Sequence, residues 1–216
     1  MKSTKKIFMA IAVLTMAAGL LMLTGCGLLI QHDEELVGTW YWNADGAYRY
    51  TFNADGTGER GFPETHQTFT WSTLGDLLVI YRDHSRRNEI ANESWDFEIV
   101  DDVLTIRSHH AAKTNFSYVR GGTEQNEALV GRWRWDTNTS YIYTFHEDGT
   151  GTRNFPAPND TFTWSTHEDT LFITRDTLTA GIIRGEIWTF ELGENTITIT
   201  SQQTDEAPSL VYNRIP

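Results

Sequence analysis

Carboxylates that recur along the chain are the side chains best suited to do chemistry in this sequence. They fall into pairs 93 residues apart: Asp76 and Asp169, Asp83 and Asp176, Glu93 and Glu186, and Glu98 and Glu191. Two carboxylates held near one another can hydrolyse a glycosidic bond, so a carboxylate hydrolase is one interpretation. Acids before a strand also favour turns, and Asp83 and Asp176 directly follow arginines with which they can pair. We therefore expect these carboxylates to be structural and the protein not to be an enzyme.

Histidines give no clearer sign of catalysis or metal binding. The chain has seven histidines, and none is matched by a histidine 93 residues away. His109 and His110 are adjacent, and adjacent strand residues point to opposite faces, so these two side chains are poorly placed to share a metal. The motifs of serine hydrolases, zinc proteases and phosphate-binding loops do not occur. We expect neither a metal nor any other cofactor.

A short acidic segment with a glycine has the composition of a calcium loop. Residues 50–58 read YTFNADGTG, and residues 143–151 read YTFHEDGTG. With Gly56 at the sixth position of an EF-hand loop, the acidic first and twelfth positions would fall on Thr51 and Phe62. Asp-Gly between two alternating runs is instead a strong hairpin signal. We predict hairpin turns at Asp55-Gly56 and Asp148-Gly149, with each glycine at positive φ.

The charge balance of the protein excludes one class of partner. The net charge is −12 at pH 7, and Lys113 is the only lysine after the first 25 residues. A surface this acidic repels nucleic acid, so we expect no nucleic-acid partner. The 8 Trp, 8 Tyr and 11 Phe residues indicate a packed core or binding faces rather than a disordered chain.

The first 26 residues have the composition of an export signal. A basic stretch, MKSTKK, precedes an apolar run and then LTGC at residues 23–26. This ending resembles the lipobox of bacterial lipoproteins, which implies that residues 1–25 are a signal peptide and that Cys26 carries the lipid. We then expect attachment to the extracytoplasmic face of the cell membrane, or to an outer membrane if the host has one. The alternatives are a secretory signal peptide or a transmembrane helix with an incidental cysteine.

The remainder of the chain consists of two copies of one unit. LVGTWYW in the first copy matches LVGRWRW in the second, and TFTWST recurs unchanged. We predict a tether at residues 26–34, a first unit at 35–120, a linker at 121–127 and a second unit at 128–216. Because two copies are too few for an open solenoid, each unit should close upon itself.

Each unit contains about eight short segments in which apolar and polar residues alternate, which indicates β-strands. We predict an all-β fold of two tandem, small, antiparallel up-and-down β-barrels after an N-terminal signal helix. Gly38-Thr39-Trp40 and Gly131-Arg132-Trp133 resemble the G-x-W that opens the first strand of lipocalins. Arg120 and Arg214 resemble the arginine that lipocalins pack across that tryptophan. The resemblance implies small lipocalin-like barrels, as found in bacterial lipoproteins, with a tryptophan plugging one end.

The interior of such a barrel has room for little beyond its own side chains. Each unit is about half the length of a full lipocalin, and many large rings fall on the predicted inward face. We therefore favour a solid aromatic core over a ligand cavity, with a small wet pocket near the rim as the alternative. The most different parts of the two copies are HSRRNEIANE and TLTAGIIRGE, which are candidate binding loops or loops that merely vary. Their candidate residues are His84, Arg86, Arg87, Ile182, Ile183 and Arg184.

These observations favour a noncatalytic, lipid-anchored lipoprotein that serves as a binding module at the cell envelope. Its partners would be the membrane, through the lipid on Cys26, and a small molecule, a glycan or a protein. The alternative is a structural or assembly protein of the envelope with solid barrel cores and no ligand. A carboxylate hydrolase is a third interpretation.

Overall fold

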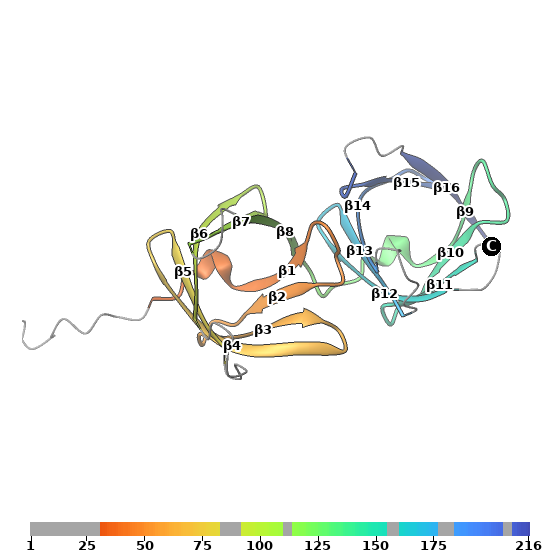
Figure 1. Cartoon of the computed structure of the whole chain (residues 1–216). Helices are drawn as coiled ribbons and strands as arrows, with labels where there is room; N and C mark the ends of the chain where they lie inside the picture. The colour runs from red at the N-terminus through yellow and green to blue at the C-terminus, as the bar shows by residue number, and fades with distance from the viewer. Residues whose placement is uncertain (1–30, 83–91, 110–113, 155–159, 177–183, 205–208) are drawn as a thin grey trace, which may run out of the picture. The chain divides into compact units, whose positions relative to one another are not determined.

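The computed structural model describes residues 31–82, 92–109, 114–154, 160–176, 184–204 and 209–216, and His32–Pro216 forms one compact unit. Each half of this unit is a closed ring of eight antiparallel strands (Figure 1), as the alternation of apolar residues predicts. Strands that follow one another in the chain are neighbours in each barrel, and the first strand pairs with the last. Closure leaves no sheet edge exposed to pair with another chain.

The first barrel comprises β1 to β8. Their bounds are β1 Gly38–Trp42, β2 Arg49–Phe52, β3 Thr57–Phe62, β4 Thr65–Leu74, β5 Leu77–Arg82, β6 Asn92–Val100, β7 Val103–Ser108 and β8 Asn115–Gly121. A 3₁₀ turn, η1 (Glu34–Leu36), precedes β1. The ring closes where β1 runs beside β8, with Trp40 opposite Arg120 and Trp42 opposite Tyr118.

The second barrel comprises β9 to β16 and repeats this plan. Their bounds are β9 Gly131–Trp135, β10 Ile142–Phe145, β11 Thr150–Asn154, β12 Asp160–His167, β13 Thr170–Arg175, β14 Gly185–Leu192, β15 Thr196–Ser201 and β16 Leu210–Ile215. Here η2 (Glu127–Leu129) precedes β9. Trp133 lies opposite Arg214 in the closing pair of strands, as Trp40 lies opposite Arg120.

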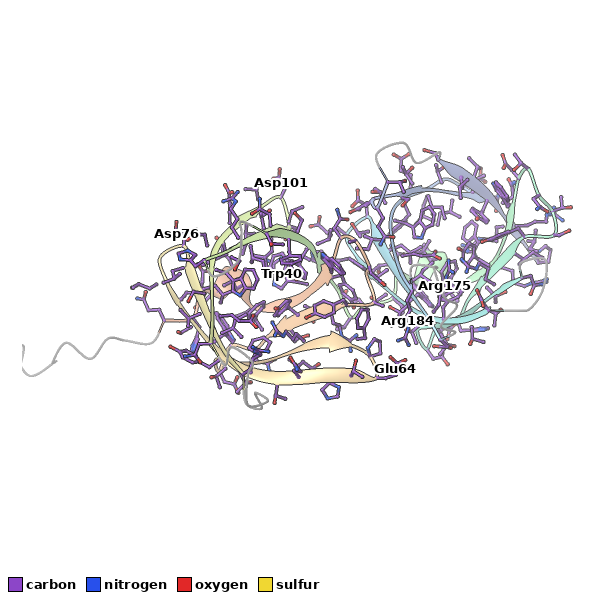
Figure 2. The ribbon with its side chains drawn as sticks, in the orientation of Figure 1. Trp40, Glu64, Asp76, Asp101, Arg175 and Arg184 are labelled. Carbon is purple, nitrogen blue, oxygen red and sulfur yellow. The ribbon has the colours of Figure 1, made fainter. Side chains whose placement is uncertain are left out.

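One end of each barrel is closed by a tryptophan. Trp40 is fully buried inside the first ring (Figure 2), and its indole N–H donates to the carbonyl oxygen of Leu36 at 2.8 Å. Arg120 lies over the indole and donates to the carbonyl oxygens of Val37 and Glu35, at 3.2 and 2.7 Å. The guanidinium therefore holds η1 across the end of the barrel while it covers the ring.

The second barrel has the same plug. The Trp133 indole N–H donates to the carbonyl oxygen of Leu129 at 2.7 Å. Arg214 covers the indole and donates to the carbonyl oxygens of Val130 and Ala128, at 2.9 and 2.5 Å. In both barrels the buried indole N–H needs a hydrogen-bond acceptor, and the face of the indole ring attracts a guanidinium. These two requirements explain the arrangement without common ancestry with lipocalins.

The Asp-Gly segments are tight turns. Gly56 has φ +81° between β2 and β3, and Gly149 has φ +79° between β10 and β11. The indole of Trp71 donates to the carbonyl oxygens of Asn53 and Thr57, at 3.2 and 3.0 Å, so a buried side chain fixes the first turn from inside. Trp164 makes the equivalent bonds in the second barrel. In each barrel the Asp-Gly turn is therefore held by hydrogen bonds from a buried tryptophan that also recurs, Trp71 in the first and Trp164 in the second.

The two barrels have separate cores. Trp40, Phe52 and Trp71 are central to the first, and Trp133, Phe145 and Trp164 are their counterparts in the second. A third, smaller cluster joins strands of both barrels: Tyr41 of β1 stacks on Phe172 of β13 with ring centres 4.3 Å apart, and Ile187 of β14 is fully buried beside them.

Candidate ligand site

A pocket opens at the end of the first barrel that the tryptophan plug does not close. Its volume is about 410 Å³, and it is lined by Trp42, Tyr48, Tyr50, Arg60, Phe62, Glu93, Trp95, Phe116 and Tyr118. Trp40 and Trp42 point into the same barrel, because strand residues two apart share a face. β1 therefore carries the plug in its middle and a pocket wall at its end.

The walls of the pocket are aromatic. Tyr48 lies edge-on to Phe62 with ring centres 5.3 Å apart, and Trp42 lies edge-on to Phe116 at 6.2 Å. These four rings are only partly buried, whereas Tyr50 and Tyr118 below them are almost completely buried. Side chains therefore fill the plugged end, whereas at the open end they leave a pocket near the rim, which is the alternative that the sequence left open.

An ion pair lies at the floor of the pocket. Arg60 of β3 donates to both carboxylate oxygens of Glu93 of β6, at 2.8 and 2.9 Å, and Arg82 of β5 lies 3.3 Å from the same carboxylate. The side chains of Arg60 and Glu93 are only 11 % and 16 % exposed. The floor of the pocket is therefore fixed by charge-assisted hydrogen bonds that are shielded from water.

Two neighbours tie this ion pair to the aromatic wall. The Tyr50 hydroxyl accepts a hydrogen bond from Arg60 at 2.5 Å, and the Trp95 indole N–H donates to Glu93 at 3.3 Å. Burial raises the pKa of the Tyr50 and Tyr118 phenols well above their ordinary value, so both are neutral at pH 7. Burial lowers the pKa of Arg60, but Tyr50 and Glu93 raise it by more, and its guanidinium stays charged.

The second barrel carries the matching ion pair. Glu186 of β14 accepts a hydrogen bond from Arg153 of β11 at 3.0 Å and also pairs with Arg175 of β13. Arg153 donates to the Tyr143 hydroxyl at 3.1 Å, as Arg60 donates to Tyr50. Both barrels thus place two arginines around one glutamate below a layer of aromatic rings.

One charged residue distinguishes the two ion pairs. Arg153 also donates to the carboxylate of Asp160 at 2.9 Å, and Asp160 is opposite Arg153 in the register of β11 and β12. Gln67 occupies the corresponding position opposite Arg60 in the register of β3 and β4. Among the described residues, the cluster of the second barrel therefore contains a second carboxylate where the first barrel has the amide of Gln67 in register.

The structure corrects the interpretation of the recurring carboxylates and arginines. Arg175, which the sequence led us to pair with the adjacent Asp176, pairs instead with Glu186. Arg82 pairs with Glu93, and the predicted pair of Arg82 with Asp83 stays a prediction because Asp83 lies outside the described residues. Asp76 is at the tip of the β4–β5 hairpin (Figure 2), in a turn as predicted, and Glu98 forms an exposed pair with Arg107 at 3.4 Å.

The candidate binding loops receive little support from the structure. His84, Arg86, Arg87, Ile182 and Ile183 lie outside the described residues, as does Cys26, the residue predicted to carry a lipid. Arg184 is the one candidate residue that is described. Its side chain is buried, donates to both carboxylate oxygens of Glu64 and donates from Nε to the carbonyl oxygen of Arg175 at 3.0 Å.

The Asp-Gly turns use their carboxylates internally. The Asp55 carboxylate accepts hydrogen bonds from the backbone N–H and the hydroxyl of Thr57, at 2.9 and 2.6 Å. Asp148 and Thr150 make the same two bonds. Within the described ranges, no group of three or more His, Cys, Asp or Glu side chains is placed to hold a metal ion.

Comparison of the chain with known proteins gave no assignment: no protein-family model and no curated protein sequence matches it. In the part of the chain that the structure describes, no helix has the length and apolar character needed to cross a membrane. The candidate site consequently rests on its own geometry.

Arg60 and Arg153 are the site residues that our sequence reasoning missed. Both lie within a recognised repeat, GERGFP and GTRNFP, and each falls two residues after a glycine that faces the barrel interior. A charged residue that recurs on the inward face of a strand needs a buried partner. That signal, read together with the recurring Glu93 and Glu186, would have indicated the ion pairs.

Proposed function

We propose that this protein is a noncatalytic, lipid-anchored binding protein of the cell envelope that holds a small, largely apolar molecule in the pocket of its first barrel. The observation that carries this proposal is the 410 Å³ pocket, walled by partly buried aromatic rings and floored by the ion pair of Arg60 and Glu93. Small-molecule sites are typically concave, mainly apolar and about 300–1,000 Å³ in volume, with a few polar groups that fix orientation.

The pocket suits binding better than it suits catalysis. A general acid must release a proton to the substrate, and a general base must accept a proton from it. Glu93 instead accepts two hydrogen bonds from Arg60 and lies 3.3 Å from Arg82, so both oxygens of its carboxylate are already engaged. The ion pair is therefore suited to shaping and polarising the floor rather than to turning over a substrate.

The proposal is tested with the full-length protein in lipid nanodiscs by isothermal titration with 1-naphthaleneacetamide, a neutral two-ring probe, with empty nanodiscs as the blank. We expect saturable binding that Trp42→Ala weakens about tenfold, since one aromatic contact contributes about 1.4 kcal/mol. The matched control is Trp135→Ala, which alters the second barrel and should leave this binding unchanged. A titration without saturable heat, or equal weakening by both variants, would refute the proposal in favour of a structural role.

A further inference from the structure

We infer that the pocket of the first barrel recognises a ligand that carries a quaternary ammonium group, and that Phe116 is a determinant of this specificity. The inference rests on the proposed function, because it assumes that the pocket holds a small molecule. It adds the chemical class of that molecule: a cation whose charge is surrounded by methyl or methylene groups, so that its surface is largely apolar.

The apolar part of the pocket lining is entirely aromatic among the described residues. Apart from Arg60 and Glu93, every lining residue is Trp, Tyr or Phe. The core of the same barrel also contains aliphatic side chains, and Leu36, Leu78 and Ile80 are fully buried in it. Aliphatic side chains would supply apolar surface equally well, whereas only an aromatic ring attracts a cation to its face. The restriction to rings at the open end therefore favours a ligand that carries positive charge.

Five of these rings follow one another around the open end of the barrel and form an aromatic arc. Their order is Phe62, Tyr48, Trp42, Phe116 and Trp95, with successive ring centres 5.3, 6.0, 6.2 and 6.0 Å apart. The planes of successive rings meet at 78°, 74°, 67° and 71°, and all five rings are partly exposed. Because neighbouring rings are close to perpendicular, the arc presents ring faces in more than one direction, as a cage around a compact cation requires.

The charged residues of the lining neither favour nor oppose a cation by their sum. In the described part of the chain these residues are Arg60 and Glu93, one of each sign, joined by two hydrogen bonds at 2.8 and 2.9 Å. The attraction for a cation therefore comes from the ring faces of the aromatic arc. The net charge of the whole chain, −12, also favours a cation over an anion in solution.

The pocket suits a quaternary ammonium better than a primary one. A primary ammonium has three N–H donors, and each needs an acceptor when water is removed. Both oxygens of the Glu93 carboxylate already accept hydrogen bonds from Arg60, and one of them also accepts from Trp95 at 3.3 Å. The Tyr50 hydroxyl accepts from Arg60 as well. A quaternary ammonium has no N–H group, so its methyl groups can contact the rings without any acceptor.

The two barrels differ at the position of Phe116. Phe116 is opposite Ile106 in the register of β7 and β8, and Leu210 is opposite Ile199 in the register of β15 and β16. In the aromatic arc, Phe116 is the ring between the two tryptophans. A leucine side chain has no ring face, so the second barrel has no cation-attracting group at the position that joins the two halves of the arc. Phe116 is therefore the residue at which cation binding by the two barrels should diverge.

The experiment compares choline with 3,3-dimethyl-1-butanol, which has a carbon atom in place of the quaternary nitrogen, by isothermal titration of the full-length protein in phosphatidylglycerol nanodiscs. We expect choline to bind about tenfold more tightly, because attraction to the ring faces acts on the cation alone. Phe116→Leu, which introduces the side chain found in the second barrel, should reduce this ratio about threefold. The matched control Phe116→Tyr keeps a ring and should keep the ratio.

Two further titrations define the ligand more closely. Ethanolamine, a primary ammonium, should bind more weakly than choline, since its N–H groups lack acceptors in the pocket. Ethanolamine binding as tight as that of choline would overturn the assignment to a quaternary ammonium. Choline is then titrated in phosphatidylcholine nanodiscs: an unchanged affinity assigns a free cation as the ligand, and an affinity lowered by competition assigns the headgroup of a lipid.

The neutral probe 1-naphthaleneacetamide separates failure of this inference from failure of the proposed function. If it binds while choline binds no more tightly than 3,3-dimethyl-1-butanol, the inference is overturned and the proposed function is intact. Absence of saturable binding of every probe would remove the proposed function itself. An unchanged ratio in Phe116→Leu would overturn the assignment of Phe116. If circular dichroism shows that this variant does not fold, Phe62→Leu at the end of the aromatic arc takes its place, and an unchanged ratio there would overturn the cage.

Discussion

The guanidinium carbon of Arg120 lies 4.1 Å from the centre of the Trp40 indole, and the Arg214 guanidinium lies 4.2 Å from that of Trp133. In each barrel the arginine comes from the last strand and the tryptophan from the first, so the stacked pair joins the two strands at which the ring closes. The same arginine holds the 3₁₀ turn that precedes the first strand. These contacts therefore link the pairing of the first and last strands to the position of the 3₁₀ turn that covers one end of the barrel.

Loss of the plug should unfold one barrel. Trp40 is fully buried, and removal of a buried Trp side chain typically costs about 3–5 kcal/mol, a large share of the stability of a small domain. We expect Trp40→Ala to abolish the thermal transition of the first barrel and to leave the second barrel folded but less stable, since its core is separate while Phe172 and Ile187 lose their contact with Tyr41. Calorimetry with Trp133→Ala as the reciprocal variant checks this. A folded Trp40→Ala protein that has lost only ligand affinity would contradict a structural role.

Substitution of Gly56 should be more harmful than substitution of Gly75. Both glycines have positive φ, +81° and +58°, but a Cβ at Gly56 would lie 2.3 Å from the His32 ring, whereas a Cβ at Gly75 would meet nothing within 4 Å. We expect Gly75→Ala to cost about 1 kcal/mol from backbone strain alone. Gly56→Ala should cost more, and Gly56→Val more again because a β-branched residue is poorly tolerated there. Equal melting temperatures for the two alanine variants would exclude the steric contribution.

Calcium should not stabilise the protein. The Asp55 carboxylate is occupied by two hydrogen bonds from Thr57, and these bonds lower its pKa. We expect the same melting temperature with millimolar calcium as with a chelator, measured by differential scanning fluorimetry. A calcium-dependent rise that Asp55→Ala removes would show that the turn binds the metal.

Alkaline pH should destabilise both barrels. Burial raises the pKa of Tyr50, Tyr118 and Tyr212 above the value of about 10 that tyrosine has in an unfolded chain. The folded state therefore binds more protons than the unfolded state above pH 10. The stability that these neutral phenols contribute is complete below pH 10 and is lost as the pH rises toward their folded values. Thermal unfolding at pH 8 and pH 11 should show a fall in melting temperature that Tyr118→Phe lessens.

Lipidation should depend on one residue. Cys26 is the only cysteine in the chain and ends the sequence LTGC. We expect Cys26→Ser to abolish incorporation of a radiolabelled fatty acid and to change the membrane association of the protein in cell fractionation. Labelling that persists in this variant would show that the cysteine is incidental, and the binding proposal would then stand without the anchor.

Local sequence patterns were sufficient for the architecture. Alternation of apolar and polar residues predicts strands because neighbouring side chains point to opposite faces. The Asp-Gly pairs predict turns because glycine adopts positive φ at little cost, and Gly56 and Gly149 do so. The 93-residue repeat predicts two closed units rather than one, and the structure confirms two eight-stranded barrels. All of these signals depend on residues close together in the chain or on direct comparison of the copies.

The candidate site was decided by the tertiary structure. Arg60 and Glu93 are 33 residues apart on β3 and β6, and only the curvature of the closed ring brings them together. The pocket exists because side chains fill one end of the barrel and leave about 410 Å³ at the other, between aromatic rings of β1, β2, β3, β6 and β8. Packing volumes of that kind do not follow from the alternation of residue types. Glu186 meets Arg153 and Arg175 for the same reason, because side chains from three strands share the inside of the ring only when the barrel has formed.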